Sequence, residues 1–255
     1  MSHKSPEIRV CKGRPFRAHL YRNDVAVDYG AGEIDIDGRG ERSEITMLTK
    51  ASLKRLCFVA HNTAVRFDCM VTLTYPKTFE SDGQRVKRHL QRWLQWAQRR
   101  GRIGDYLWAL EFQRRQAPHF HIFTHGGELL KMKTAVSEKW FNIVDSGDEK
   151  HLLAGTRTER LRVPDAAGRY AAKYASKPHQ KAVPPDYRNV GRFWGHSRNV
   201  APVEMAARSL EGWGDLIDEM DGWDYIERLK KRKPIGVLYN ASRFLQEKYE
   251  REGEM

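Results

Sequence analysis

Two strand-like runs joined by a short polar turn most constrain what this chain can fold into. The runs are DYLWALEF (105–112) and PHFHIFTH (118–125), and QRRQA separates them. Both are rich in aromatic and large aliphatic residues, which is typical of strands, and a connection of this length suits a hairpin. Alternation in the second run places Phe120 and Ile122 on one side of the strand, toward a core. The sequence therefore predicts a β-hairpin in the middle of a sheet.

Further strands and helices alternate around this hairpin. Strands are expected at 67–75, where β-branched residues end at Pro76, and at 157–163. Helices are expected at 43–63 behind a Ser43 cap, at 84–100 before Gly101, at 132–144, and at 166–177 behind an Asp165 cap. In the helix at 84–100, the apolar spacing predicts that Leu90, Trp93, Leu94 and Ala97 are buried. This order indicates an α+β domain built on one sheet.

The two ends of the chain differ in composition from this central part. Residues 1–42 are rich in Gly, Asp and Arg and are expected to form an irregular lead-in with one short strand. Residues 201–255 are highly charged and are expected to be a helical C-terminal region. The remaining residues, 43–200, form the predicted functional domain.

The charge balance favours a polyanionic partner. Lys and Arg number 45 against 33 Asp and Glu, which gives a formal net charge of +12. Such an excess attracts a phosphate backbone, so nucleic acid is the leading partner class. An ordinary basic surface or an acidic protein partner is the alternative.

Cysteine usage and hydropathy predict a soluble protein of the cytoplasm. The three cysteines, Cys11, Cys57 and Cys69, show no metal-binding spacing and fit a reducing interior. No apolar run approaches the roughly 20 residues of a membrane span. The N-terminus lacks the apolar core of a signal peptide.

His119 and His121 form a candidate metal site. Side chains at i and i+2 of a strand share a face, so the two imidazoles are expected to stand together. Neighbouring imidazoles bind a divalent cation, and a carboxylate commonly completes such a site. Glu111, near the end of the preceding strand, is the nearest candidate carboxylate. A pair of surface histidines is the alternative interpretation of this short pattern.

The predicted helix 166–177 carries a candidate nucleophile. Tyr170, Lys173, Tyr174 and Lys177 fall on one side of a helix with 100° per residue, and alanines occupy the other side. A phenolate attacks a phosphodiester, and a neighbouring ammonium group favours the ionised phenol and neutralises developing phosphate charge. Tyrosines anchored in the core, with solvated lysines, are the alternative.

Taken in order, these features resemble the HUH endonucleases, in particular the replication initiators (Rep proteins) of bacterial single-stranded DNA phages and rolling-circle plasmids. The resemblance lies in MVTLTYP (70–76), the His119-Phe120-His121 pair, and Tyr-x-x-Lys at Tyr170/Lys173 and again at Tyr174/Lys177. The doubled tyrosine motif is similar to the two-tyrosine branch. The resemblance spans about residues 43–200, and the chain has no GxxxxGK(S/T) loop of a fused helicase.

The resemblance implies both a fold and an activity. The fold is a five-stranded antiparallel sheet of ferredoxin-like or RRM-like form with flanking helices. The activity is metal-dependent nicking of single-stranded origin DNA with Mg²⁺ or Mn²⁺, in which a tyrosine forms a 5′-phosphotyrosyl link and leaves a 3′-OH primer. Tyr174 is expected to act first and Tyr170 in the second cleavage. A host helicase and polymerase are the implied partners, in the cytoplasm of a bacterial host.

A further stretch, GRFWGHSRNV (191–200), is a candidate for contact with the DNA strand. Aromatic rings stack on unpaired bases while arginines contact phosphates. The candidate residues are Arg192, Phe193, Trp194 and Arg198. Cover for a sheet edge is the alternative.

Two other functions remain open from the sequence. A relaxase or transposase of the HUH type uses the same chemistry, although relaxases carry their tyrosine near the N-terminus. A non-catalytic nucleic-acid-binding protein on an RRM-like sheet would carry base-stacking aromatic rings where this chain has His119 and His121.

Overall fold

The structure, a computed structural model, describes residues 16–21, 25–28, 44–99, 101–162, 166–175 and 182–210. The chain divides into two compact units, of which the larger is residues 40–202. The smaller unit combines residues 1–39 with 203–255.

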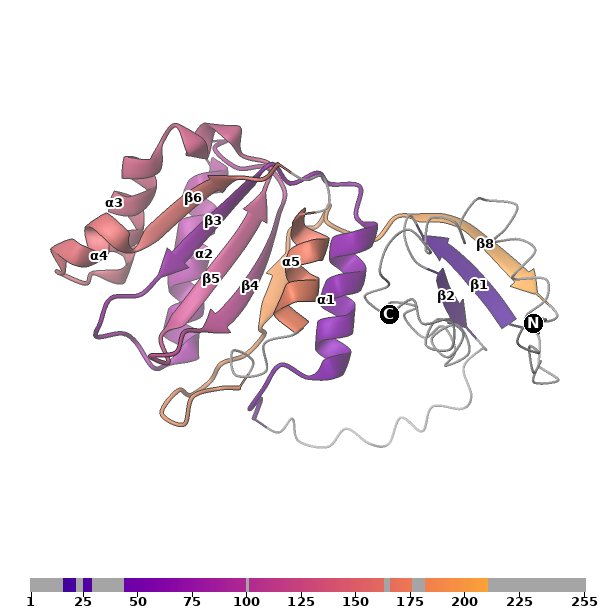
Figure 1. Cartoon of the computed structure of the whole chain (residues 1–255), viewed down its shortest axis with the longest axis horizontal. Helices are drawn as coiled ribbons and strands as arrows, with labels where there is room; N and C mark the ends of the chain where they lie inside the picture. Colours follow the sequence, from indigo (N-terminus) through magenta and orange to yellow (C-terminus); the bar gives the residue numbers. More distant parts are fainter. Residues whose placement is uncertain are drawn as a thin grey trace, which may run out of the picture. The chain divides into compact units, whose positions relative to one another are not determined.

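The larger unit is built on a five-stranded sheet in the order β6-β3-β5-β4-β7 (Figure 1). Every neighbouring pair is antiparallel. The strands are β3 (Cys69–Thr74), β4 (Tyr106–Phe112), β5 (Pro118–Thr124), β6 (Thr156–Arg160) and β7 (Trp194–His196). The predicted α+β fold with a five-stranded antiparallel sheet is confirmed, and the predicted hairpin is β4 and β5.

Helices flank this sheet on both faces. They are α1 (Lys50–Asn62), α2 (Gly83–Arg99), α3 (Lys133–Val144), α4 (Glu149–Ala154) and α5 (Ala166–Ala175), with a short 3₁₀ turn η1 (Gly127–Leu130). Helix α5 packs beside α1, and α2 crosses behind the strands in the view of Figure 1. Among the described helices, none combines the length and the apolar character that a membrane span needs.

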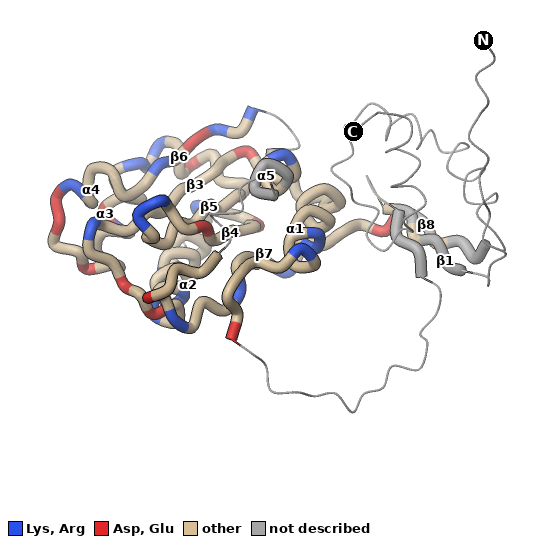
Figure 2. The backbone as a smooth tube through the Cα atoms, turned by 60° about the horizontal axis from the view of Figure 1, so that its bottom comes forward, with Lys and Arg blue, Asp and Glu red and all other residues tan. Residues whose placement is uncertain are grey.

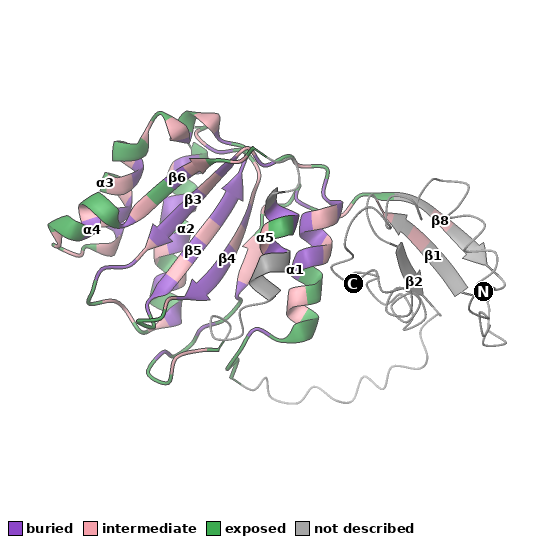
Figure 3. Ribbon diagram, viewed as in Figure 1, coloured by how far each residue is buried: buried purple, intermediate pink, exposed green. Residues whose placement is uncertain are grey.

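Helix α2 covers one face of the sheet and forms much of the core. Its predicted inward residues are buried, with Trp93 and Ala97 fully enclosed. On the facing strand β5, Phe120 and Ile122 are also fully buried, as the alternation predicted (Figure 3). Burying each large apolar side chain contributes about 1.5–3 kcal/mol, so this layer supplies a large part of the stability.

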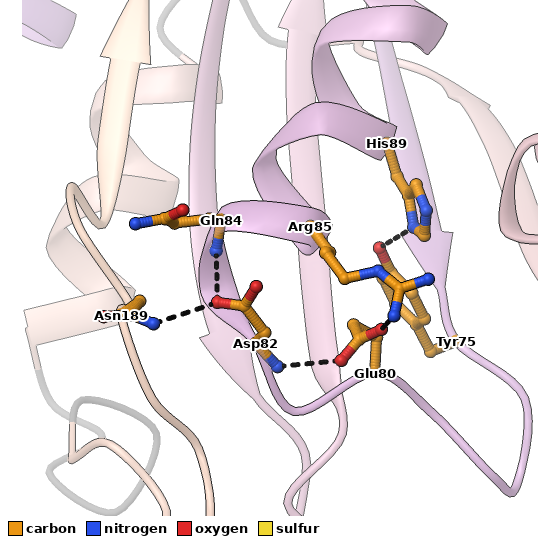
Figure 4. A network of polar contacts seen from close by, with 7 residues as sticks. All are labelled: Tyr75, Glu80, Asp82, Gln84, Arg85, His89 and Asn189. Carbon is orange, nitrogen blue, oxygen red and sulfur yellow. Dashed lines mark hydrogen bonds and ion pairs between the residues drawn. The ribbon is translucent and has the colours of Figure 1, made fainter.

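The start of α2 is held by a segment far along the chain. The carboxylate of Asp82 accepts hydrogen bonds from the Gln84 backbone at 3.1 Å and from the Asn189 side chain at 3.2 Å (Figure 4). A Cβ atom on Gly83 would lie 2.3 Å from the carbonyl oxygen of Asn189, so only glycine allows this approach. The helix ends before Gly101, whose φ of 62° is left-handed, as the sequence predicted.

Lys87 fastens the same distant segment to the middle of the layer. Its ammonium group donates to the carbonyl oxygens of Val190, at 2.9 Å, and Arg192, at 2.6 Å. It also lies 5.2 Å from the centroid of the Trp108 ring. Burial lowers the pKa of Lys87 to about 7. The residues leading into β7 are thereby fixed to α2.

Two expected boundaries are wrong. The first helix begins at Lys50, because the side chain of Thr49 accepts a hydrogen bond from the Ser52 backbone at 3.2 Å and caps it. Ser43 lies outside the described residues, and 44–49 are not helical. The strand expected at 157–163 is β6, which ends at Arg160. The short helices η1 and α4 had no counterpart in the sequence interpretation.

The smaller unit contains a three-stranded antiparallel sheet in the order β2-β1-β8. Its strands are β1 (Phe16–Tyr21), β2 (Val25–Asp28) and β8 (Glu204–Leu210). The lead-in was expected to hold one strand and residues 204–210 to be helical, so both expectations differ from the structure. The pairing of β1 with β8 joins residues that are far apart in sequence, and local patterns carry no sign of it. Residues 211–255, where further helices were expected, lie outside the described part.

Candidate active site

The two histidines of β5 stand side by side on the sheet face opposite α2. The ring centroids of His119 and His121 are 4.5 Å apart and the rings are nearly perpendicular. Phe120 between them points the other way, into the core. The shared face predicted from the i, i+2 spacing is therefore present.

Glu111 reaches this pair from the neighbouring strand. It is the cross-strand partner of His119 in the β4–β5 ladder. Its carboxylate oxygen Oε2 lies 3.5 Å from Nε2 of His121, and the residue is only 4% exposed. A buried carboxylate is costly unless polar groups surround it, so its position beside two imidazoles indicates a site rather than a packing role.

Two threonines of β3 complete the polar row, and sequence reasoning assigned them no role. The hydroxyl of Thr74 lies 2.9 Å from Nδ1 of His119, and that of Thr72 lies 3.3 Å from Nδ1 of His121. The register places each threonine directly opposite its histidine. The signal was present in VTLTYP, since alternate residues of a strand share a face.

The end of β3 is itself fixed from the other side. The carbonyl oxygen of Thr74 accepts hydrogen bonds from Nε1 of Trp140 and from Nε2 of His151, both at 2.8 Å. Trp140 is fully buried, and burial lowers the pKa of His151, which favours its neutral form. The backbone that positions Thr74 is thus held by α3 and α4.

Tyr170 of α5 enters the site from above the sheet. Its hydroxyl donates a hydrogen bond to Oε1 of Glu111. Its ring lies 4.8 Å from the ring of His121 and 5.0 Å from that of Phe123, centroid to centroid. Ala167 and Ala171 of the same helix are buried, and their small side chains permit close packing. The structure therefore brings Tyr170 together with Glu111 and the histidine pair.

The other predicted residues of the tyrosine helix lie partly or wholly beyond the described structure. The backbone of α5 includes Lys173 and Tyr174, but their side chains are outside the described part. Lys177 lies wholly outside it.

The donor set suits a divalent cation by its chemistry. Two imidazoles and one carboxylate match the ligands that such ions take in proteins. Nevertheless, across the described ranges, no group of three or more His, Cys, Asp or Glu side chains is arranged so that it could hold a metal ion. Glu111 accepts a hydrogen bond from Tyr170 instead. Binding an ion here requires the carboxylate to exchange that partner.

The stretch 191–200 contributes one ring to the site's face. Trp194 lies opposite Ala109, which in turn lies opposite His121, so about 10 Å of sheet separates Trp194 from His121. The indole ring is half-buried, donates to the hydroxyl of Ser52 at 3.0 Å, and stacks with His196 at 5.9 Å.

Of the other three residues proposed for DNA contact, one does not fit. Phe193 is 3% exposed and packs against Phe112 on the opposite side, so its ring is not available for stacking on a base. The expectation for Phe193 is wrong because alternation of the chain entering β7 sends it into the core. Arg192 and Arg198 are exposed.

Comparison with known proteins agrees with the position of this site. Residues 68–179 match the family model of the replication-associated protein ORF2. The matched segment begins at the residue before β3 and includes the histidine pair, Glu111 and α5. No curated protein and no solved structure matches the chain. This segment is therefore similar to replication-associated proteins of the rolling-circle initiator type.

Proposed function

We propose that this chain nicks single-stranded origin DNA with a tyrosine nucleophile and a divalent metal ion. The observation that carries the proposal is the hydrogen bond from Tyr170 to Glu111 beside His121. A phenol, a buried carboxylate and paired imidazoles on one sheet face are the parts that this reaction needs. The match to replication-associated proteins supports it and indicates DNA as the substrate.

The chain's own residues would divide the work as follows. His119, His121 and Glu111 would hold a Mg²⁺ or Mn²⁺ ion, which supplies polarisation of the scissile phosphate. The tyrosine oxygen forms a bond to phosphorus, and the bond from phosphorus to the 3′ oxygen breaks. The phenol loses its proton and the departing 3′ oxygen gains one, which leaves a 3′-OH and a 5′-phosphotyrosyl link. The free 3′-OH then primes synthesis by a host polymerase, with unwinding by a host helicase in the bacterial cytoplasm.

The same face argues against a purely binding role. Base-binding sheets of the RRM kind present open aromatic rings on their central strands. Here the corresponding positions of β5 are His119 and His121, and the ring of Phe123 is covered by Tyr170. The central strands thus offer polar and titratable groups where a stacking platform would need exposed rings.

Covalent capture of labelled DNA tests the proposal. The full chain is incubated with Mn²⁺ and single-stranded DNA from the replicon, carrying a label on the 3′ side of the nick, and is analysed on a denaturing gel. A labelled band at the mass of the protein is expected, and excess EDTA should remove it. Cleavage that persists in EDTA, or cleavage without an adduct, would reject the tyrosine and metal mechanism.

A further inference from the structure

The outer side of helix α2 has an unusual composition. Every exposed residue of this helix is an arginine or a glutamine, namely Gln84, Arg85, Arg88, Gln91, Arg92, Gln95, Gln98 and Arg99. The helix contains no acidic residue. It covers the sheet face away from His119 and His121, so this surface is separate from the candidate active site (Figures 1 and 2).

Folding stability does not account for this arginine stripe. Arg85, Arg88 and Arg92 are three and four residues apart, where like charges destabilise a helix by about 0.2–0.5 kcal/mol per pair. A cation in the first turn also opposes the helix dipole, and no acid there offsets it. Because exposed charges add little to stability, the stripe indicates a partner rather than a structural role.

Most of these charges remain available to a partner. Arg85 pairs with Glu80 at 2.9 Å (Figure 4). Arg88, Arg92 and Arg99 form no ion pair with any residue that the structure describes. The positive field is felt locally, since burial and then the neighbouring Arg92 lower the pKa of His89.

The dimensions suit a nucleic-acid backbone. With a rise of 1.5 Å per residue, Arg88 and Arg99 lie roughly 16 Å apart along the helix axis. Double-stranded DNA carries one phosphate charge per about 1.7 Å of its axis, so this length spans on the order of ten charges.

The same surface lacks the features that bind unpaired bases. Single-strand binding relies on exposed aromatic rings. Trp93 is fully buried, and Trp96 is half-buried with the Arg102 guanidinium 4.4 Å from its ring. Arginine and glutamine side chains instead contact phosphate oxygens without regard to sequence.

We propose that the exposed arginine and glutamine face of α2 binds the sugar–phosphate backbone of double-stranded DNA. This second surface is independent of the nicking chemistry, and it gives the protein a hold on duplex while the opposite sheet face engages a single strand.

Salt-dependent binding of the full chain to a random-sequence duplex tests the proposal. The variant Arg88→Gln/Arg92→Gln/Arg99→Gln should bind at least tenfold more weakly at low salt. Three lost phosphate contacts should reduce the slope of log affinity against log salt by about 2.7. Glutamine is a good helix former, so thermal unfolding should occur at or above the temperature of the unaltered chain. If the triple variant does not fold, Arg92→Gln alone should reduce the slope by about 0.9.

A matched control separates this surface from net charge. Lys131→Gln/Lys133→Gln/Lys150→Gln removes the same charge from exposed positions outside α2 and should leave duplex binding nearly unchanged. An unaltered slope in the α2 variant, or an equal loss in the control, would overturn the proposal. So would poly-glutamate binding that depends on the three arginines while duplex binding does not, because the surface would then serve an acidic protein. The covalent adduct with single-stranded DNA should form in both variants, so failure of this proposal and failure of the nicking function are distinguishable.

Discussion

The hydroxyl of Thr74 lies 2.9 Å from Nδ1 of His119, directly across the β3–β5 ladder. This contact fixes the orientation of the imidazole and engages one of its two nitrogens, leaving Nε2 for another partner. Thr72 stands in the same relation to His121 at 3.3 Å. Under the proposed function, the two threonines are positioning residues for the metal-binding histidines.

Thr74→Val should weaken Mn²⁺ binding by about 10- to 100-fold, the usual effect of losing a hydrogen bond to a metal-ligating histidine. Valine keeps the shape and the strand preference of threonine, so the fold should persist. Titration calorimetry of the full chain with Mn²⁺ measures the change. Thr74→Ser should restore affinity, and Thr78→Val, at an exposed position, should have no effect. Equal affinities for the Thr74→Val and unaltered proteins would contradict the role.

His121→Ala should abolish the covalent adduct while leaving most DNA binding intact. The imidazole is proposed to hold the ion, whereas phosphate contacts are spread over many basic residues. Adduct gels and binding curves on the same preparation compare the two effects. His125→Ala is the matched control, because the His125 side chain is 71% exposed at the end of β5 and pairs with Asp68. Undiminished adduct in His121→Ala would remove the metal site.

Lys87 should make the protein more stable as the pH rises from 7 to 9. Burial lowers its pKa from 10.5 to about 7 in the folded chain, so in this window the folded form has lost a proton that the unfolded form keeps. The free energy of unfolding therefore increases with pH, by at most about 1.4 kcal/mol per unit. The raised pKa of Cys69, about 12 against 9.0, acts in the opposite direction only above pH 9.

Urea denaturation at several pH values measures this slope. Lys87→Met should remove the rise between pH 7 and 9, whereas Lys133→Met, at an exposed position, should keep it. The lowered pKa values of His89 and His151 act below pH 6.5 and do not disturb the comparison. A slope that Lys87→Met leaves unchanged would show that Lys87 is charged in the fold at neutral pH.

Periodicity was enough to predict the central sheet and the shared face of the histidines. The alternation around Phe120 and the helical spacing around Trp93 are local signals, and both residues are buried as expected. The register that brings Glu111 beside His119 followed from the short connection of a hairpin. These parts depend on contacts between residues close in sequence.

What local patterns missed depends on distant contacts. The pairing of β1 with β8 and the hold of Lys87 on Val190 join segments far apart in the chain. Phe193 was expected to face DNA because its neighbours are basic, but three residues of β7 are too few to show which side is buried. The role of Thr74 became clear only from the register between β3 and β5.

Tyr174→Phe should lose the first covalent adduct, whereas Tyr170→Phe should still nick but fail to release unit-length circles. The two positions are one helical turn apart on α5, so either phenol can serve one phosphate in turn. In the folded protein the Tyr170 hydroxyl donates a hydrogen bond to Glu111, and it is therefore held as a neutral phenol until that carboxylate changes partner. This contact favours Tyr174 for the first cleavage and Tyr170 for the second. Tyr187→Phe is the matched control, since that hydroxyl is buried with no hydrogen-bond partner among the described residues. Mass spectrometry of the DNA-linked peptide decides the order: a first adduct only on Tyr170 reverses it, and an adduct on neither tyrosine removes the mechanism.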